Sequence, residues 1–269
     1  EGCQILMVNK RFCEIIGFSK EELVGQNTKR YYLDDLSYKT ARQKISNTDK
    51  HSYITLEHQL KRKDNKSIWC EFVGSQIELT KHNNAILWSI LDITAQKEMQ
   101  EKLEQEATTD YLTKLYNRRY FASRLEEEVF RVKRNKKTET SLLMFDLDKF
   151  KLVNDSYGHL AGDTVIKNFA NILKKHLRKV DIVGRIGGEE FAMILPNTSI
   201  EKAIILANRI REEVSSQTTN IYEKNIKFTV SIGVTSLSYD DINSDTALSR
   251  ADSALYMAKK NGRNRVEKK

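Results

Sequence analysis

The chain has 269 residues, of which 39% are hydrophobic and 30% are charged, and its formal net charge at pH 7 is +8. This length predicts two domains, and the composition is that of a soluble, globular protein rather than a membrane-spanning one. No apolar run approaches the roughly 20 residues that cross a bilayer, and no signal peptide is visible, so we expect a cytoplasmic protein. Because the sequence opens at Glu1 within what reads as folded sequence, we expect a fragment, and a membrane-anchored full-length protein stays open.

The positive charge is concentrated at one end of the chain. Residues 259–269 carry six basic side chains and one acidic one, whereas residues 1–98 carry 15 basic and 13 acidic side chains. A short basic end suits a few phosphate groups better than a long duplex, and a solvated tail is the alternative. We therefore expect no nucleic acid partner.

Three cysteines, Cys3, Cys13 and Cys70, form neither a CxxC pair nor a metal-site spacing with histidine. They argue against structural zinc and against a disulfide scaffold, and we expect reduced thiols.

Residues 1–94 mix short helices and strands. In "NKRFCEIIGFSKEELVGQN", residues Phe12, Ile15 and Ile16 share one helical face, and Ser19 is a predicted N-cap with Glu22 three residues on. Strands are expected over 52–63, 67–79 and 85–94, with turns at "KDNK" and "KHNN" between them. This pattern predicts a small α+β domain with an antiparallel sheet.

Residues 95–108 change to Gln, Glu and Lys, with Met99 and Leu103 four positions apart and no Gly or Pro. We expect a stiff connector helix, and two apolar positions leave a coiled-coil seam open.

From residue 109 to 269, strands alternate with helices. Helices are expected over 117–137, 153–177, 199–215 and 244–262. A glycine break interrupts the second helix, and Gly262 is expected to cap the last. Strands are expected over 140–148 and 227–237, and a hairpin joins "DIVGRI" to "EEFAMIL". The alternation predicts a layered α/β domain with helices on the faces of one central sheet.

The stretch "RIGGEEF" (185–191) places two glycines and two acids between apolar runs. Gly187 and Gly188 predict a two-residue type I′ turn, which needs positive φ at both positions. That turn does not account for Glu189 and Glu190. Adjacent carboxylates repel one another unless a cation or solvent neutralises them, and oxygen atoms are the ligands that Mg²⁺ takes.

A second acidic pair, Asp146 and Asp148, follows the apolar run "LLMF". Carboxylates at strand ends beside a hairpin are suited to hold one or two Mg²⁺ against substrate phosphates, as phosphoryl and nucleotidyl transfer require. For each acid alone, a solvated strand end is the alternative. The residues therefore favour a metal-dependent nucleotide enzyme.

Five motifs together resemble the GGDEF family of diguanylate cyclases over about residues 105–269. They are "TDYLTKLYNRRYF", "FDLDKFKLVND", "YGHLAGD", "RIGGEEF" and "ALYMAKKNGRNRV". The resemblance implies a fold similar to the palm of nucleotide cyclases and polymerases. It also implies condensation of two GTP into cyclic di-GMP with release of two pyrophosphates.

The resemblance implies a metal site for two Mg²⁺, with Mn²⁺ as an alternative. Asp146, Glu189 and the backbone carbonyl of Leu147 would be ligands, and Glu190 would assist the metals or deprotonate the attacking 3′-hydroxyl. Which acid is the base stays open.

It also implies a nucleotide site. Asn154 and Asp163 would bind the guanine edge, which selects GTP because a wrong base leaves buried polar groups unpaired, and His159 would line the nucleoside pocket. The phosphates would meet Lys151, a candidate catalytic residue, with Lys259, Arg263 and the backbone at Gly187 and Gly188. Taken singly, His159 reads as a helix start, Asn154 as a local cap and Lys151 as a surface lysine.

"RKVD" (178–181) lies at the position of the family's inhibitory RxxD motif. The resemblance implies that Arg178 and Asp181, with Arg209 from a following helix, bind cyclic di-GMP as a feedback inhibitor. As bare sequence the motif reads as a salt bridge beside a strand.

Two positions depart from the family pattern. Lys114 replaces the usual glycine after "LT", in a segment without assigned chemistry. Glu189 replaces aspartate and keeps a carboxylate, so activity is expected to persist.

The first domain resembles a PAS sensor in its "NKRFCEIIGFSKEELVGQN" segment, "RKDNKSIW" hairpin and terminal "DIT" (92–94). Its ligand is unknown. The histidines read as ordinary surface or strand residues rather than haem ligands, and the tryptophans as core or dimer-interface residues; these are His51, His58, His82, Trp69 and Trp88.

We therefore expect a homodimer, joined through the PAS domain and the connector helix, that brings two GTP-loaded domains together. The alternative is a catalytically silent domain that acts as a receptor for cyclic di-GMP or GTP.

Overall fold

The computed structural model describes residues 3–47, 52–80, 83–135, 138–221 and 224–269. It divides the chain into two compact units, Glu1–Leu103 and Glu104–Lys269. Within the described residues no helix has the length and apolar character needed to cross a membrane.

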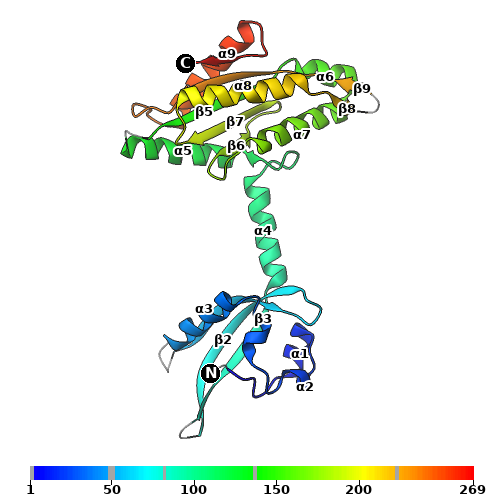
Figure 1. The fold of residues 1–269 in the computed structure, drawn as a ribbon, viewed down its shortest axis with the longest axis vertical. Coiled ribbons are helices and arrows are strands. Elements are labelled where there is room, and N and C mark those ends of the chain that lie inside the picture. The colour runs from blue at the N-terminus through cyan, green and yellow to red at the C-terminus, as the bar shows by residue number, and fades with distance from the viewer. Residues whose placement is uncertain (1–2, 48–51, 81–82, 136–137, 222–223) are drawn as a thin grey trace. The chain divides into compact units, whose positions relative to one another are not determined.

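The first unit places short helices before a three-stranded sheet (Figure 1). Its helical segments are α1 (Lys10–Ile16), α2 (Lys20–Leu23), the 3-10 turn η1 (Thr28–Tyr31) and α3 (Asp35–Ser46). Its strands β1 (Ile54–Lys61), β2 (Ser67–Thr80) and β3 (Asn83–Asp92) are antiparallel in the order β1-β2-β3. The predicted capping box is confirmed, because Ser19 and Glu22 each accept from the other's backbone N–H.

Trp88 is packed partly into this sheet's core. A side chain at Gly74, its register partner, would overlap the Trp88 ring, so glycine makes room for the indole. Trp69 is instead covered by the Lys97 ammonium, 5.4 Å from the ring centroid. His58 is partly buried, and all three cysteines are free thiols. His51 and His82 lie outside the described residues.

The connector α4 (Thr94–Thr108) is confirmed as a helix in which no residue is buried. Met99 and Leu103 are 58% and 57% exposed, so the helix presents two apolar side chains one turn apart to solvent.

The second unit is a six-stranded sheet between two helical layers. Its order is β11-β10-β5-β7-β6-β4, with parallel pairing of β10 with β11 and β4 with β6. The strands are β4 (Tyr116–Asn117), β5 (Thr140–Leu147), β6 (Ile182–Arg185), β7 (Glu190–Pro196), β10 (Val230–Ser236) and β11 (Val266–Lys268). A separate hairpin pairs β8 (Thr219–Ile221) with β9 (Lys224–Ile226).

Each face of the sheet has its own apolar cluster. One packs α6 (Phe150–Tyr157), α7 (His159–Lys175) and α8 (Ile200–Ser216) against alternate strand residues such as Phe145 and Phe191. The other packs α5 (Arg118–Arg134) and α9 (Ser244–Lys260) against Met144 and Ala192. Because successive side chains of a strand point to opposite faces of the sheet, the position of an acid in its strand determines the face on which it lies.

The predicted type I′ turn is wrong. Gly187 and Gly188 do not have positive φ, and four residues rather than two join β6 to β7, so the turn is not type I′. The predicted glycine cap of α9 is confirmed, because Gly262 follows the C-cap residue Asn261 with φ of 119° and the Arg263 N–H donates to the Ala258 carbonyl at 3.0 Å. The glycine break between α6 and α7 is confirmed at Gly158, with φ of 81°.

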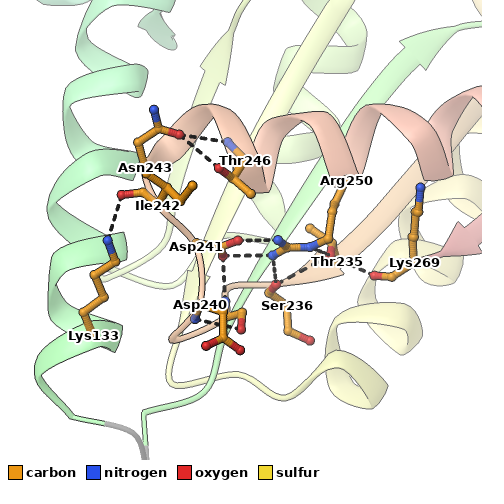
Figure 2. A network of polar contacts seen from close by, with 11 residues as sticks. Lys133, Thr235, Ser236, Asp240, Asp241, Ile242, Asn243, Thr246, Arg250 and Lys269 are labelled. Carbon is orange, nitrogen blue, oxygen red and sulfur yellow. Dashed lines mark hydrogen bonds and ion pairs between the residues drawn. The ribbon is translucent and has the colours of Figure 1, made fainter.

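Arg250 holds helix α9 by an ion pair with Asp241 and by hydrogen bonds to strand β10 (Figure 2). The Arg250 guanidinium binds the carboxylate of Asp241, which is 1% exposed, and donates to Thr235 Oγ1 at 3.2 Å. It also donates to the Ser236 carbonyl at 2.7 Å. These contacts anchor the start of the helix whose far end carries Lys259.

Candidate active site

Three acidic residues lie at the same end of the two central strands β5 and β7. Asp146 and Glu190 are register partners on β5 and β7, and both lie on the α9 face by alternation with Phe145 and Phe191. Glu189 precedes Glu190 in the connecting loop. The Lys259 ammonium of α9 lies 2.7 Å from the Asp146 carboxylate, whose side chain is 8% exposed.

The site disfavours negative charge when it holds only protein atoms. Burial raises the pKa of Asp146; Lys259 opposes this rise and the charge of Asp148 adds to it. Burial also raises the pKa of Glu189, and repulsion from Asp146 and Glu190 adds to the rise. A bound cation would lower the pKa values of both carboxyl groups and favour their ionised forms.

The donor set fits a small hard cation. The Leu147 N–H donates to the Glu189 carbonyl at 3.3 Å, and since N–H and C=O of one strand residue point the same way, the Leu147 carbonyl faces this loop as well. Two carboxylates, one carbonyl and substrate phosphates are typical of Mg²⁺ sites. Among the described residues no three acid, His or Cys side chains form a metal-holding group. The three carboxylates are therefore not gathered into one cluster.

An ion pair between residues distant in sequence holds the 186–189 loop between β6 and β7. Arg185 donates to the Gly188 carbonyl at 2.8 Å and 3.1 Å, and its Nη1 lies 3.2 Å from both carboxylate oxygens of Asp110. A side chain at Gly187 would overlap the Glu190 carboxylate, whereas one at Gly188 would meet open space. Gly187 therefore leaves room for the acid.

Asp148 does not share this end of the site. Its carboxylate accepts from Thr229 and Ser231 hydroxyls, each at 2.7 Å, and from the Asn264 N–H at 3.0 Å. It lines a cleft of about 640 Å³ together with Arg263.

Asn154 on α6 lies against Gly162, the residue before Asp163 on α7. A Cβ at Gly162 would overlap the Asn154 Oδ1, so the amide lies over the glycine that precedes Asp163. His159 is exposed at the first position of α7, and Lys151 is exposed on α6. The sequence analysis missed Gly162, although its motif contains that residue.

Arg178, Asp181 and Arg209 line one cleft of about 220 Å³. Asp181 Oδ2 accepts from the Arg178 N–H at 2.8 Å, while its Oδ1 is buried without a partner, and burial raises the pKa of this carboxyl. His176 and Lys202, which the sequence analysis also missed, line the same cleft.

Comparison with known proteins identifies the two units. Residues 107–265 match the family model described as diguanylate cyclase, GGDEF domain, and residues 1–95 match that of the PAS domain. The chain is 39% identical over 198 residues to diguanylate cyclase A of Treponema denticola, covering 73% of this chain and 53% of that protein. The chain thus spans about half the length of this relative.

Solved structures of GGDEF domains also match the chain. The coiled coil and GGDEF domain of DgcB from Caulobacter crescentus in complex with c-di-GMP matches with a TM-score of 0.63 and 33% identity, over 66% of this chain and 93% of that one. The active GGEEF domain of a diguanylate cyclase from Vibrio cholerae matches with a TM-score of 0.53 and 36% identity, over 56% of this chain and 96% of that one.

The fold and the acidic site therefore define a nucleotide-cyclase type of domain following a PAS domain. The chain belongs to the GGDEF diguanylate cyclase family.

Proposed function

We propose that this chain is a Mg²⁺-dependent diguanylate cyclase that condenses two GTP into cyclic di-GMP and two pyrophosphates. The observation that carries the proposal is the paired Asp146 and Glu190 on adjacent strands, with Glu189 beside them and Lys259 2.7 Å from Asp146. The GGEEF sequence of the active Vibrio cholerae domain supports glutamate at position 189.

In the proposed reaction the cyclase unit of each chain binds one GTP, and the cyclase units of two chains face each other. The 3′-oxygen of each nucleotide attacks the α-phosphorus of the other, so two such steps close the ring. In each step the bond to pyrophosphate breaks, and the 3′-proton passes to a carboxylate, for which Glu190 is the candidate. Asp146, Glu189 and the Leu147 carbonyl would hold Mg²⁺, which when bound neutralises phosphate charge and activates the hydroxyl. Asn154 and Asp163 would bind guanine, with His159 along the pocket.

Basic residues are proposed to bind the triphosphate. Lys259 and Arg263 flank the C-terminal end of α9, and Lys151 projects from the helix after the acidic strand. Arginine suits phosphate as a fork and lysine as a point charge. The open space at Gly188 is consistent with close approach of the phosphates to the backbone.

Product inhibition is proposed at the cleft of Arg178, Asp181 and Arg209. Two arginines supply donors for phosphates and guanine edges, and the buried Asp181 Oδ1 without a partner is an acceptor for a guanine N–H. Replacing Arg178 with alanine should leave initial turnover intact and remove the slowing caused by added cyclic di-GMP. Unchanged slowing would contradict this site.

Regulation is proposed to act through dimerisation of the PAS unit, residues 1–94, and the connector, residues 95–108. A second copy covering Met99 and Leu103 would bury the two exposed apolar side chains of α4. In this proposal residues 109–269 form the cyclase domain.

The test of the activity is direct. The chain, stripped of bound nucleotide, is given GTP and Mg²⁺, and the products are separated by chromatography while pyrophosphate is counted. Two pyrophosphates per cyclic di-GMP, lost in Glu190→Gln, are expected. Binding of cyclic di-GMP without turnover would instead favour the receptor alternative.

A further inference from the structure

The turn after α9 has an unusual backbone. Arg263 and Asn264 have φ of 65° and 45°, in the left-handed region that L-residues disfavour, and they follow Gly262 at 119°. Such a conformation persists only where the surroundings fix it. The same turn carries the arginine proposed to bind phosphate.

Asp148, which directly follows strand β5, binds the backbone of this turn. The Asn264 N–H donates to Asp148 Oδ2 at 3.0 Å, and Asp148 is only 7% exposed. Two hydroxyls of the neighbouring segment, Thr229 and Ser231, donate to the same carboxylate at 2.7 Å and hold it in place. Three donors therefore occupy both oxygens, which leaves this acid poorly suited to be a metal ligand.

Asp148 follows the end of β5, and its contact with Ser231, the register partner of Asp146 on β10, places it on the same face of the sheet as Asp146. One acid of this pair lies at the proposed metal site, and the other binds the turn of the proposed phosphate-binding residue. A shift of this turn would move Arg263 relative to Asp146.

We propose that Asp148 is a positioning residue that locks the 262–264 turn and thereby aims Arg263 at the substrate triphosphate. This inference rests on the proposed function. It assigns the second acid of "FDLD" a role distinct from that of the first.

A double-mutant cycle tests the proposal on the full chain. The probe is 3′-deoxy-GTP, which lacks the attacking hydroxyl, and its affinity is measured for the unaltered chain, Asp148→Asn, Arg263→Ala and the double variant. Each single variant should weaken binding by about tenfold or more, and the double variant no further than Arg263→Ala alone. Asp252→Asn, an exposed acid on α9, is the matched control and should bind normally.

A second probe separates positioning from general loss of structure. Affinity for 3′-deoxy-GMP, which lacks the β- and γ-phosphates, should change much less in Asp148→Asn. Equal losses for both probes, or single-variant losses that multiply in the double variant, would overturn the proposal. If Asp148→Asn does not fold, Ser231→Ala, which removes one hydroxyl that holds the Asp148 carboxylate in place, should weaken 3′-deoxy-GTP binding in the same direction, and unchanged binding would overturn the proposal.

The outcomes also separate this inference from the proposed function. If the unaltered chain does not bind 3′-deoxy-GTP, the proposed function fails and the inference fails with it. If the unaltered chain binds the probe but the cycle is additive, only the inference fails.

Discussion

Gly162 controls the position of Asn154, the proposed guanine-binding amide. An alanine there would displace the Asn154 side chain, because the added Cβ overlaps its Oδ1. Within a helix, glycine to alanine also favours the folded backbone by up to roughly 1 kcal/mol. The added Cβ would also lie 3.0 Å from Cζ of the buried Phe150, which offsets this gain. We predict that Gly162→Ala raises the KM for GTP about tenfold.

Asn154→Ala is the comparison for this prediction. It should raise the KM to a similar degree, and the double variant should be no worse than either single one. A normal KM in Gly162→Ala would show that the Asn154 position does not limit GTP binding.

Lys114 shows why the family prefers glycine at this position. Its φ is 57°, in the left-handed region, and its side chain is exposed. We predict that Lys114→Gly raises the free energy of unfolding by about 1 kcal/mol, measured by urea denaturation. Lys114→Ala should give no gain, since alanine keeps the Cβ; an equal gain in both variants would contradict the backbone explanation.

The ion pair between Asp110 and Arg185 predicts a pH dependence. Burial raises the pKa of Asp110, but hydrogen bonds from Thr113 together with the Arg185 guanidinium outweigh burial and hold this pKa below its ordinary value of 3.8. Such a carboxyl stabilises the fold above its unfolded pKa, and the stabilisation is lost as pH falls through its folded pKa.

We predict that Asp110→Asn lowers the free energy of unfolding at pH 7 by roughly 1–3 kcal/mol. The same variant should flatten the decline of stability below about pH 4, because the titrating group is gone. Urea denaturation at pH 7 and pH 3 checks both. An acid decline as steep as that of the unaltered chain would mean that other carboxyls dominate it.

At the scale of elements, periodicity predicted the long helices and strands, because their apolar faces are buried locally. The strands β4, β8, β9 and β11 have two or three residues each, too few for a pattern, and pairing with other strands creates them. The 186–189 loop escaped prediction for a similar reason. Its shape depends on Arg185, which is held by Asp110, 75 residues away in sequence.

The site was also predictable only in part from the sequence. The motifs identified Asp146, Glu189 and Glu190, but the pairing of Asp146 with Glu190 follows only from strand register. Asp148 looked equivalent to Asp146 in sequence, and only its three donors distinguish it. The role of Gly162 likewise depends on which side chain lies over it.

The α4 helix gives a prediction about association. Met99→Glu with Leu103→Glu would place charge on the apolar stripe, and Gln105→Glu on the opposite side is the control. We predict that the double variant loses turnover several-fold at dilute protein and regains it as protein concentration rises. Turnover equal to that of the control at every concentration would exclude α4 from the dimer.

At the scale of the whole molecule, the central claim is that one active site needs two copies of the cyclase unit. Each unit offers one set of acids and one proposed guanine site, which suffices for one GTP. The claim is tested most directly by measuring cyclic di-GMP formation against protein concentration at saturating GTP and Mg²⁺. We predict that turnover per chain rises with concentration and then reaches a plateau, in step with the dimer fraction measured by sedimentation. Turnover per chain that stays constant where the protein is monomeric would contradict the account.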